Sequence, residues 1–201
     1  MFLYSIVIKM DDDIAVDLIS VAHKAMQDVQ LHYSIAGWTH RGMKVRRNAS
    51  KWAVTKEEYA FDEFPDFVSG WVYATNLRTV QKLVSHAILD SNPLWIDDAW
   101  LTGIVRQKAK TINLVGWDQF YSPYTEHLQC CINDDDRWCD FLAMPSGYNE
   151  AFIEAYGQQA LNCHMEQSCS RRKWSESVWN NCQVDNPLFL PESKGVGRVF
   201  T

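Results

Sequence analysis

The chain has 201 residues, of which 47% are hydrophobic and 13% aromatic, and its formal net charge is −6. This composition suffices for one large packed domain, or a smaller one with an appendage, and excludes a disordered chain. The acidic balance argues against nucleic-acid binding and against attachment to anionic lipid, and no apolar stretch is long enough to cross a membrane.

An apolar run at the N-terminus is followed closely by three aspartates. Residues 1–8 are rich in β-branched and aromatic side chains and predict a buried strand. The triplet Asp11, Asp12 and Asp13 comes after it, and adjacent carboxylates are costly unless a divalent cation supplies positive charge. A solvated acidic turn is the alternative. Because ligands of α/β proteins bind at the carboxyl ends of strands, the preceding strand favours a cation site.

The triplet leads into the pattern of an amphipathic helix. Apolar residues recur at helical spacing from residue 14 to about residue 30, and either Asp13 or Asp17 can cap this helix. Residues 31–38 have the composition of a strand. A turn and a return strand at residues 43–46 are expected to follow.

A second buried strand is predicted at residues 68–74. Its Gly70 indicates that another part of the chain approaches closely, because a side chain at this position would obstruct it. Asn76 can cap a helix over residues 77–89, whose apolar side chains share one face.

A second acidic pair, Asp97 and Asp98, precedes residues 99–105. One of the two is expected to cap a helix, which is the simplest structural role for such a pair. One more short strand is predicted at residues 111–115. The acidic residues at positions 133–136 have no buried strand before them, and we interpret them as a solvated turn.

The last third of the chain, residues 116–201, has no sustained periodicity and contains all the cysteines: Cys130, Cys131, Cys139, Cys163, Cys169 and Cys182. Their even number in a loop-rich region predicts disulfides and an oxidising compartment, with the pairing left open. A zinc site with His164 is the alternative, although no C-x-x-C pair is present. A glycosylation sequon at residues 48–50 also fits a secretory lumen.

Four motifs occur together in a characteristic order: IKMDDDIAV at residues 8–16, SKWAV at 50–54, FPDFVSGWVY at 64–73 and IDDAWLTG at 96–103. In this order and spacing they resemble the β-1,3-glycosyltransferases, typified by β-1,3-galactosyl- and β-1,3-N-acetylglucosaminyltransferases and the more distant Fringe enzymes. The resemblance covers roughly residues 4–115.

The resemblance implies an α/β domain of the GT-A type that uses a UDP-sugar donor and Mn²⁺. By position in the DxD motif, Asp13 would ligate Mn²⁺. Asp11 and Asp12 would face the ribose and the sugar-diphosphate. A metal at this position would stabilise the negative charge of the leaving UDP as a Lewis acid.

The other motifs carry the remaining expected site residues. Asp98 matches the general base of the family, preceded by Asp97, where many members have Glu. Ser69 and Gly70 would line the pocket for donor and acceptor. Fringe-like members have a further histidine metal ligand after the base, for which His127 is the candidate; a surface histidine without a ligand is the alternative.

The predicted activity is therefore inverting transfer of galactose or N-acetylglucosamine in β-1,3 linkage to a glycan on a glycoprotein or glycolipid. A carboxylate such as Asp98 would take the proton from the attacking hydroxyl. A non-catalytic family member that binds glycan or protein partners is the first alternative. A Mg²⁺-dependent phosphotransferase is disfavoured because no phosphate-binding glycines or basic cluster accompany the aspartates.

We expect two regions: a GT-A catalytic core at residues 1–115 and a Cys-rich, irregular C-terminal extension at 116–201, packed on the core. A GT-A domain has a strand-helix-strand half before its DxD strand, and this chain begins at that strand. We therefore expect an N-terminally truncated domain, either a fragment of a longer enzyme or a form that has lost its donor half. The full-length form would be a type II membrane protein of the Golgi lumen, whose anchor this chain lacks.

Overall fold

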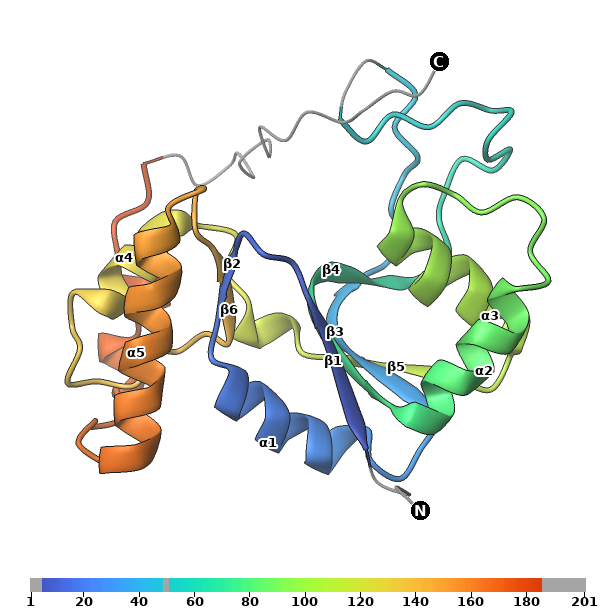
Figure 1. Cartoon of the computed structure of the whole chain (residues 1–201). Helices are drawn as coiled ribbons and strands as arrows, with labels where there is room; N and C mark the ends of the chain where they lie inside the picture. Colours follow the sequence, from blue (N-terminus) through green and yellow to red (C-terminus); the bar gives the residue numbers. More distant parts are fainter. Residues whose placement is uncertain (1–4, 49–50, 186–201) are drawn as a thin grey trace.

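A four-stranded sheet carries the N-terminal part of the chain, in a computed structural model that describes residues 5–48 and 51–185 (Figure 1). In spatial order its strands are β1 (Ile6–Met10), β4 (Phe67–Asn76), β3 (Ser34–His40) and β5 (Asn113–Gly116). β4 is antiparallel to both of its neighbours, whereas β5 is parallel to β3. The long central strand β4 therefore organises the sheet.

Helices cover both faces of this sheet. Helix α1 (Leu18–Asp28) packs on one face, and α2 (Leu77–Ala87), a π-helix (Ala99–Val105) and α3 (Arg106–Ala109) pack on the other (Figure 1). The alternation of side chains along the strands explains this division, because Ala36 contributes to the α1 core and its neighbour Ile35 to the α2 core.

A second, two-stranded sheet joins a segment from the N-terminal part of the chain to one from the C-terminal part. β2 (Ile14–Val16) pairs antiparallel with β6 (Ala143–Pro145). The helices of the C-terminal region lie on the far side of this pair from the main sheet (Figure 1). They are α4 (Thr125–Ile132), α5 (Glu150–Glu166) and α6 (Val178–Asn181), and the 3₁₀ turns Asp118–Phe120 and Trp174–Glu176 complete the chain.

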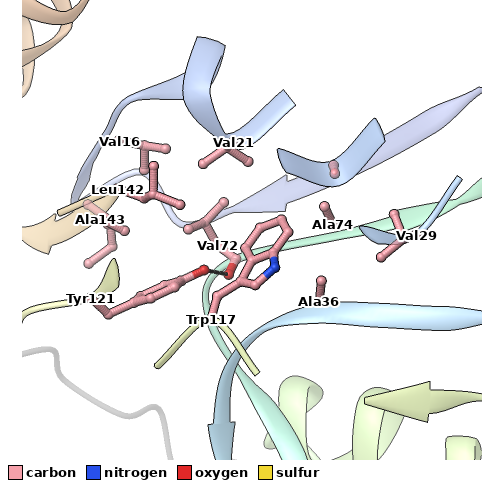
Figure 2. Close-up of a cluster of buried hydrophobic side chains, with 12 residues drawn as sticks. Val16, Val21, Val29, Ala36, Val72, Ala74, Trp117, Tyr121, Leu142 and Ala143 are labelled. Atoms are coloured by element: carbon pink, nitrogen blue, oxygen red, sulfur yellow. Dashed lines mark hydrogen bonds between the residues drawn. The ribbon is translucent and has the colours of Figure 1, made fainter. Parts of the chain in front are cut away.

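One hydrophobic core is shared by the N-terminal and C-terminal parts (Figure 2). Val16 and Val72 from the first part pack with Trp117, Tyr121 and Leu142 from the second. The hydroxyl of Tyr121 also donates a hydrogen bond to the backbone carbonyl of Val72 at 2.8 Å. The division at residue 115 stays a prediction, but each part covers apolar surface of the other.

The first predicted strand is shorter and less buried than expected. β1 spans five residues and is half-buried, and residues 1–4 of the expected strand lie outside the described residues. Its position at an edge of the sheet explains its exposure to solvent. The helix expected from residue 14 begins only at Leu18 with Asp17 as its cap, because Ile14–Val16 instead forms β2.

Other local predictions agree with the structure more closely. The strand at residues 68–74 and the helix capped by Asn76 are confirmed, as β4 and α2. Asn76 accepts from the backbone N–H of Thr79 at 2.8 Å. The return strand at 43–46 is wrong: this segment makes only isolated bridges. Two residues of the glycosylation sequon, at positions 49 and 50, lie outside the described part of the chain.

The C-terminal region is not irregular, which corrects the expectation from its sequence. Helix α5 has 17 residues and buries the stripe Tyr156, Gln159, Ala160 and Cys163, at helical spacing. A glutamine interrupts the apolar pattern of this stripe, and its side chain donates to the carbonyl of Cys131 at 2.9 Å. The helix was therefore invisible to a search for apolar periodicity. No helix in the described ranges has the length and apolar character needed to span a membrane.

All six cysteines form disulfides, which confirms the prediction of an oxidised region. The pairs are Cys130–Cys182, Cys131–Cys139 and Cys163–Cys169. The first pair ties α4 to the residues after α6. The other two close short loops at α4 and at the end of α5.

Replacing both Cys130 and Cys182 by alanine should lower the free energy of unfolding by about 4 kcal/mol, since their bridge closes a loop with a sequence separation of 52. Urea unfolding of the oxidised proteins measures this difference. Peptide mapping without reduction should recover all three pairs. Six alkylated free thiols in material from a secretory host, or a loss below about 1 kcal/mol, would contradict the assignment.

Candidate active site

The end of β1 places a lysine beside the aspartate triplet. Lys9 and Asp11 are two residues apart on a strand and share one face, and the Lys9 ammonium donates to the Asp11 carboxylate. The backbone N–H of Asp11 extends the pairing with β4 by donating to the carbonyl of Trp71 at 2.9 Å. The first aspartate is thus fixed by both its backbone and its side chain.

Gly70 on β4 connects this lysine to Asp98. The Gly70 carbonyl accepts a hydrogen bond from Lys9 Nζ at 2.8 Å, and the Gly70 N–H donates to Asp98 Oδ2 at 2.9 Å. A Cβ at this position would lie 3.1 Å from Lys9 Nζ and 3.4 Å from Asp11 Oδ2. The predicted close approach at Gly70 is confirmed, and the approaching groups are those of the candidate site.

Asp98 is held at the start of the π-helix. Its Oδ1 accepts from the backbone N–H of Ala99 at 2.7 Å, which confirms the capping role expected for one residue of the acidic pair. Thr102 links this turn to β4, because its hydroxyl donates to the Asp98 carbonyl at 2.7 Å and accepts from the Val68 N–H at 3.1 Å. The Asp98 carboxylate therefore has a fixed orientation toward the end of β1.

Burial raises the pKa of Asp98 to about 6, against the hydrogen bonds from the Gly70 and Ala99 backbones, which lower it. The pKa of Asp11 is also raised, first by burial, with Lys9 acting in the opposite direction. Tyr73, which faces Lys9 across the β1–β4 pair, has its pKa raised to about 12 by burial and by the nearby aspartates. These three groups form an acidic site with one cation at its centre.

Asp97 occupies the exposed rim of the site. Its side chain is 76% exposed, and one oxygen lies 3.9 Å from Lys9 Nζ. Ser69 is buried beside Gly70, and its hydroxyl accepts from the Trp71 N–H at 3.4 Å. The structure therefore brings Asp11, Asp97, Asp98 and Gly70 together around Lys9, with Ser69 adjacent.

Asp12 and Asp13 lie in the turn between β1 and β2. The carbonyl of Asp13 accepts from the Ser146 N–H at 3.1 Å, which fixes the turn against the end of β6. Within residues 5–48 and 51–185, neither carboxylate has a hydrogen bond or ion pair of its own. Both remain available to a ligand.

The aspartate carboxylates of this site could hold a metal ion only together with ligands from the substrate. The described residues contain no group of three or more His, Cys, Asp or Glu side chains that could hold a metal ion together. Hard divalent cations also bind through one or two carboxylates completed by substrate phosphates and water. The uncommitted Asp13 carboxylate fits that second mode and not a site built from protein ligands alone.

His127 is buried, so the surface histidine considered from the sequence is wrong. It is 2% exposed, its Nδ1 lies 2.7 Å from Ser122 Oγ, and its ring stacks on Phe141. Burial lowers its pKa and keeps the imidazole neutral at neutral pH. A metal-ligating role for His127 stays a prediction.

A known family matches the part of the chain that contains these residues. Residues 2–114 match the model of the family described as galactosyltransferase, which covers more than half of the chain. The chain belongs to the galactosyltransferase family. No curated protein matches the chain by sequence. The match includes every residue of the Lys9, Gly70 and Asp98 arrangement, and it identifies this part as a glycosyltransferase domain that takes a sugar donor and a glycan acceptor.

Two residues of the candidate site were not predicted from the sequence: Lys9 and Tyr73. The signal for Lys9 was its spacing, since residues two apart on a strand point to the same side and Asp11 was already a candidate. The position of Tyr73 depends on the β1–β4 register, in which Lys9 pairs with Tyr73. No local pattern reveals such a register.

Gly70→Ala should preserve the fold and impair glycosyl transfer. The new methyl group would meet the flexible end of Lys9, which can move, so the stability loss should stay below about 1 kcal/mol. Displacing Lys9 and Asp98 should reduce turnover by roughly 10²-fold. Thermal unfolding and a sugar-transfer assay on the protein that contains this chain measure the two effects.

Gly37→Ala is the matched control. Its Cβ would lie 3.1 Å from the Val72 carbonyl oxygen and 3.0 Å from Tyr73 Cβ, neither of which can move freely. This variant should lose about 1–3 kcal/mol of stability. Equal stability losses in the two variants, or full turnover in Gly70→Ala, would contradict the roles assigned to these glycines.

Proposed function

We propose that the chain is the catalytic part of an inverting, Mn²⁺-dependent hexosyltransferase. It transfers galactose or N-acetylglucosamine from a UDP-sugar in β-1,3 linkage to a glycan acceptor on a glycoprotein or glycolipid, in the Golgi lumen. The observation that carries the proposal is the state of Asp98, a largely buried carboxylate with a pKa of about 6, held by two backbone N–H groups beside the Asp11–Lys9 pair.

Asp98 has the properties of a general base at neutral pH. Each of its oxygens accepts one backbone hydrogen bond, which leaves a lone pair on each for a substrate proton. In the proposed reaction, the acceptor hydroxyl gives its proton to Asp98 as its oxygen attacks the anomeric carbon. The bond to the diphosphate breaks on the opposite face of the sugar, and UDP leaves with the electron pair, which inverts the anomeric centre.

Asp13 would hold the metal, with Asp11 and Asp12 toward the ribose and the sugar-diphosphate. A divalent cation supplies positive charge to the departing diphosphate. This assignment is supported by the free Asp13 carboxylate, which makes no ion pair with any other described residue. Lys9 holds Asp11 in place, and its ammonium opposes the rise in the pKa of that carboxyl that burial causes.

The pH dependence of transfer tests the base. Asp98 must be deprotonated to accept a proton, so kcat/KM should fall as the pH drops through about 6. Asp98→Asn should lose about 10²–10⁴-fold in kcat. UDP release with UDP-galactose and UDP-N-acetylglucosamine, using the protein that contains this chain, measures both.

Asp135→Asn, in the exposed acidic turn, is the control for this change and should retain activity. Asparagine offers one acceptor oxygen where Asp98 uses two, but it also removes the cost of burying an ionised carboxylate, so the variant should be at least as stable as the parent protein at neutral pH. Thermal unfolding checks that a loss of turnover is not a loss of folded protein. The assignment would be overturned if kcat/KM did not fall as the pH drops through about 6 and if Asp98→Asn kept full activity. UDP binding without turnover in the parent protein would favour the non-catalytic alternative.

The metal site is tested by Asp13→Ala. Removing the carboxylate should weaken Mn²⁺-dependent UDP binding at least tenfold, roughly the loss of one charge-assisted ligand. Calorimetry with and without Mn²⁺ measures the difference, and it requires no turnover. Asp135→Ala should leave the affinity unchanged, whereas unchanged Mn²⁺-dependent affinity in Asp13→Ala would exclude this residue as the ligand.

A further inference from the structure

A groove separate from the candidate active site lies between α1 and the disulfide-linked C-terminal region. It has a volume of about 700 Å³, within the range of ligand sites. One wall is the polar face of α1, including Lys24 and Gln27, and the opposite wall includes Trp138, His164 and Arg171. Asp13 precedes β2 and Asp17 of the groove follows it, so the two sites lie at opposite ends of that strand.

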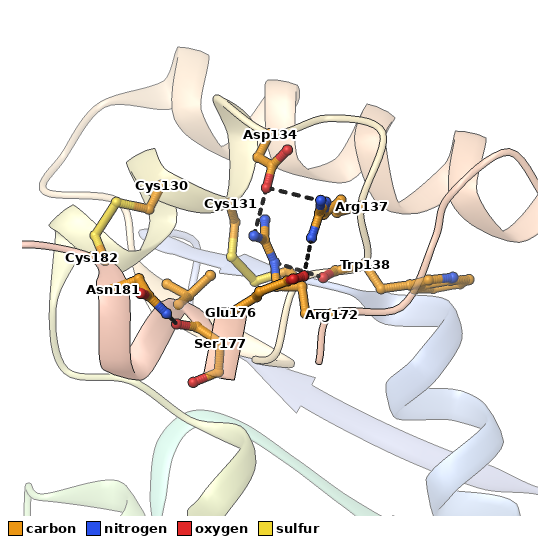
Figure 3. Close-up of polar contacts among 12 residues, drawn as sticks. Cys130, Cys131, Asp134, Arg137, Trp138, Arg172, Glu176, Ser177, Asn181 and Cys182 are labelled. Carbon is orange, nitrogen blue, oxygen red and sulfur yellow. Dashed lines mark hydrogen bonds and ion pairs between the residues drawn. A yellow bond between two sulfur atoms is a disulfide. The ribbon is translucent and has the colours of Figure 1, made fainter. Parts of the chain in front are cut away.

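Disulfides and backbone pairing build the far wall. The Cys131–Cys139 bridge holds the segment that carries Trp138, and Cys163–Cys169 holds the end of α5 next to Arg171. The two segments also pair directly, since the Trp138 N–H donates to the Ser170 carbonyl at 3.0 Å. In Figure 3 the indole of Trp138 extends from this cluster on the side of α1.

The two carboxylates that line the groove already accept hydrogen bonds from other groups of the protein. Asp17 accepts from the Ser20 N–H at 2.9 Å and lies 3.1 Å from Nε2 of His164. Asp140 accepts from the Val178 N–H at 2.6 Å. A ligand in the groove therefore meets few free acceptors.

Other polar side chains of the groove are free to bind a ligand. Arg172 lies deeper in the wall: its side chain is 8% exposed, its Nη1 lies 2.6 Å from Asp134, and its Nη2 is closed off from solvent (Figure 3). Arg171 is exposed and, like Gln27, makes no hydrogen bond or ion pair within residues 5–48 and 51–185. Arg171 and Gln27 therefore offer hydrogen-bonding groups to a ligand in the groove, and the Arg172 guanidinium adds positive charge behind them.

We propose that this groove binds an acidic oligosaccharide. Anionic sugars offer carboxylate or sulfate oxygens to Arg171, hydroxyls to Gln27, and an apolar pyranose face to the rings of Trp138 and Phe120. Both rings line the groove. The candidate active site has the opposite charge, with several aspartates around Lys9, and would repel such a ligand. The groove is therefore a second glycan site. It would hold the acidic part of a glycan away from the candidate active site, where the end of the acceptor reacts.

Binding of defined tetrasaccharides tests the proposal without any donor sugar, so the result does not depend on transferase activity. The probes are a hyaluronan tetrasaccharide, which carries carboxylates only, a heparin tetrasaccharide, which also carries sulfates, and neutral chitotetraose. Calorimetry should show at least tenfold tighter binding of one or both acidic probes than of chitotetraose, and the stronger of the two identifies the anionic group.

Arg171→Glu should weaken the acidic probe at least tenfold, whereas the matched control Arg41→Glu, at another exposed arginine without partners in the described chain, should not. Gln27→Ala should weaken it several-fold, and Asp13→Ala should have no effect. The proposal would be overturned if neither acidic probe bound, or if chitotetraose bound equally well. It would also be overturned by an unchanged affinity in Arg171→Glu or by complete competition from equimolar inorganic sulfate.

Discussion

The two hydrogen bonds made by the Gly70 backbone hold the candidate site together. The carbonyl fixes Lys9 and, through it, Asp11, while the N–H fixes Asp98. β1 and the π-helix are far apart in sequence, and the backbone of this single residue of β4 is where their charged residues meet. Any side chain at Gly70 intrudes on this meeting point, which explains why the densest part of the site is built around a residue without one.

This arrangement has an energetic cost that fits a functional site. The pKa of Asp98 rises from 3.8 to about 6 on folding, so the native state binds its proton more tightly than the unfolded chain does. The free energy of unfolding therefore falls as the pH rises between these values, by about 3 kcal/mol in total. A carboxylate chosen for stability alone would be exposed or paired with a cation, as Asp97 and Asp11 are to different degrees.

Features set by neighbouring residues were predictable from the sequence. The cap at Asn76, the close approach at Gly70 and the oxidised cysteines follow from local patterns. For the other two caps the sequence offered two candidate aspartates each, and the structure selects Asp17 and Asp98. The site itself was predictable as a set of motifs, but its central contacts were not, because they require the register of β1 against β4.

Long-range packing decided the remaining differences. Ile14–Val16 follows the helical pattern of its neighbours, yet pairing with β6 makes it a strand. His127 is polar by type, but Phe141, Tyr124 and Trp179 surround its ring. The glutamine of the α5 stripe is buried because three backbone carbonyls accept its amide.

The neighbouring cysteines of α4 have a consequence for biosynthesis. Cys130 and Cys131 are adjacent, yet one joins Cys182 and the other joins Cys139. The two short loops can oxidise as soon as their own segments leave the ribosome, whereas the bridge to Cys182 encloses both of them and must wait for the end of the region. During that interval Cys139 can pair with the wrong neighbour, and correct maturation then requires thiol–disulfide exchange. Reaching the native pairing is thus favoured by conditions that reshuffle disulfides as well as forming them.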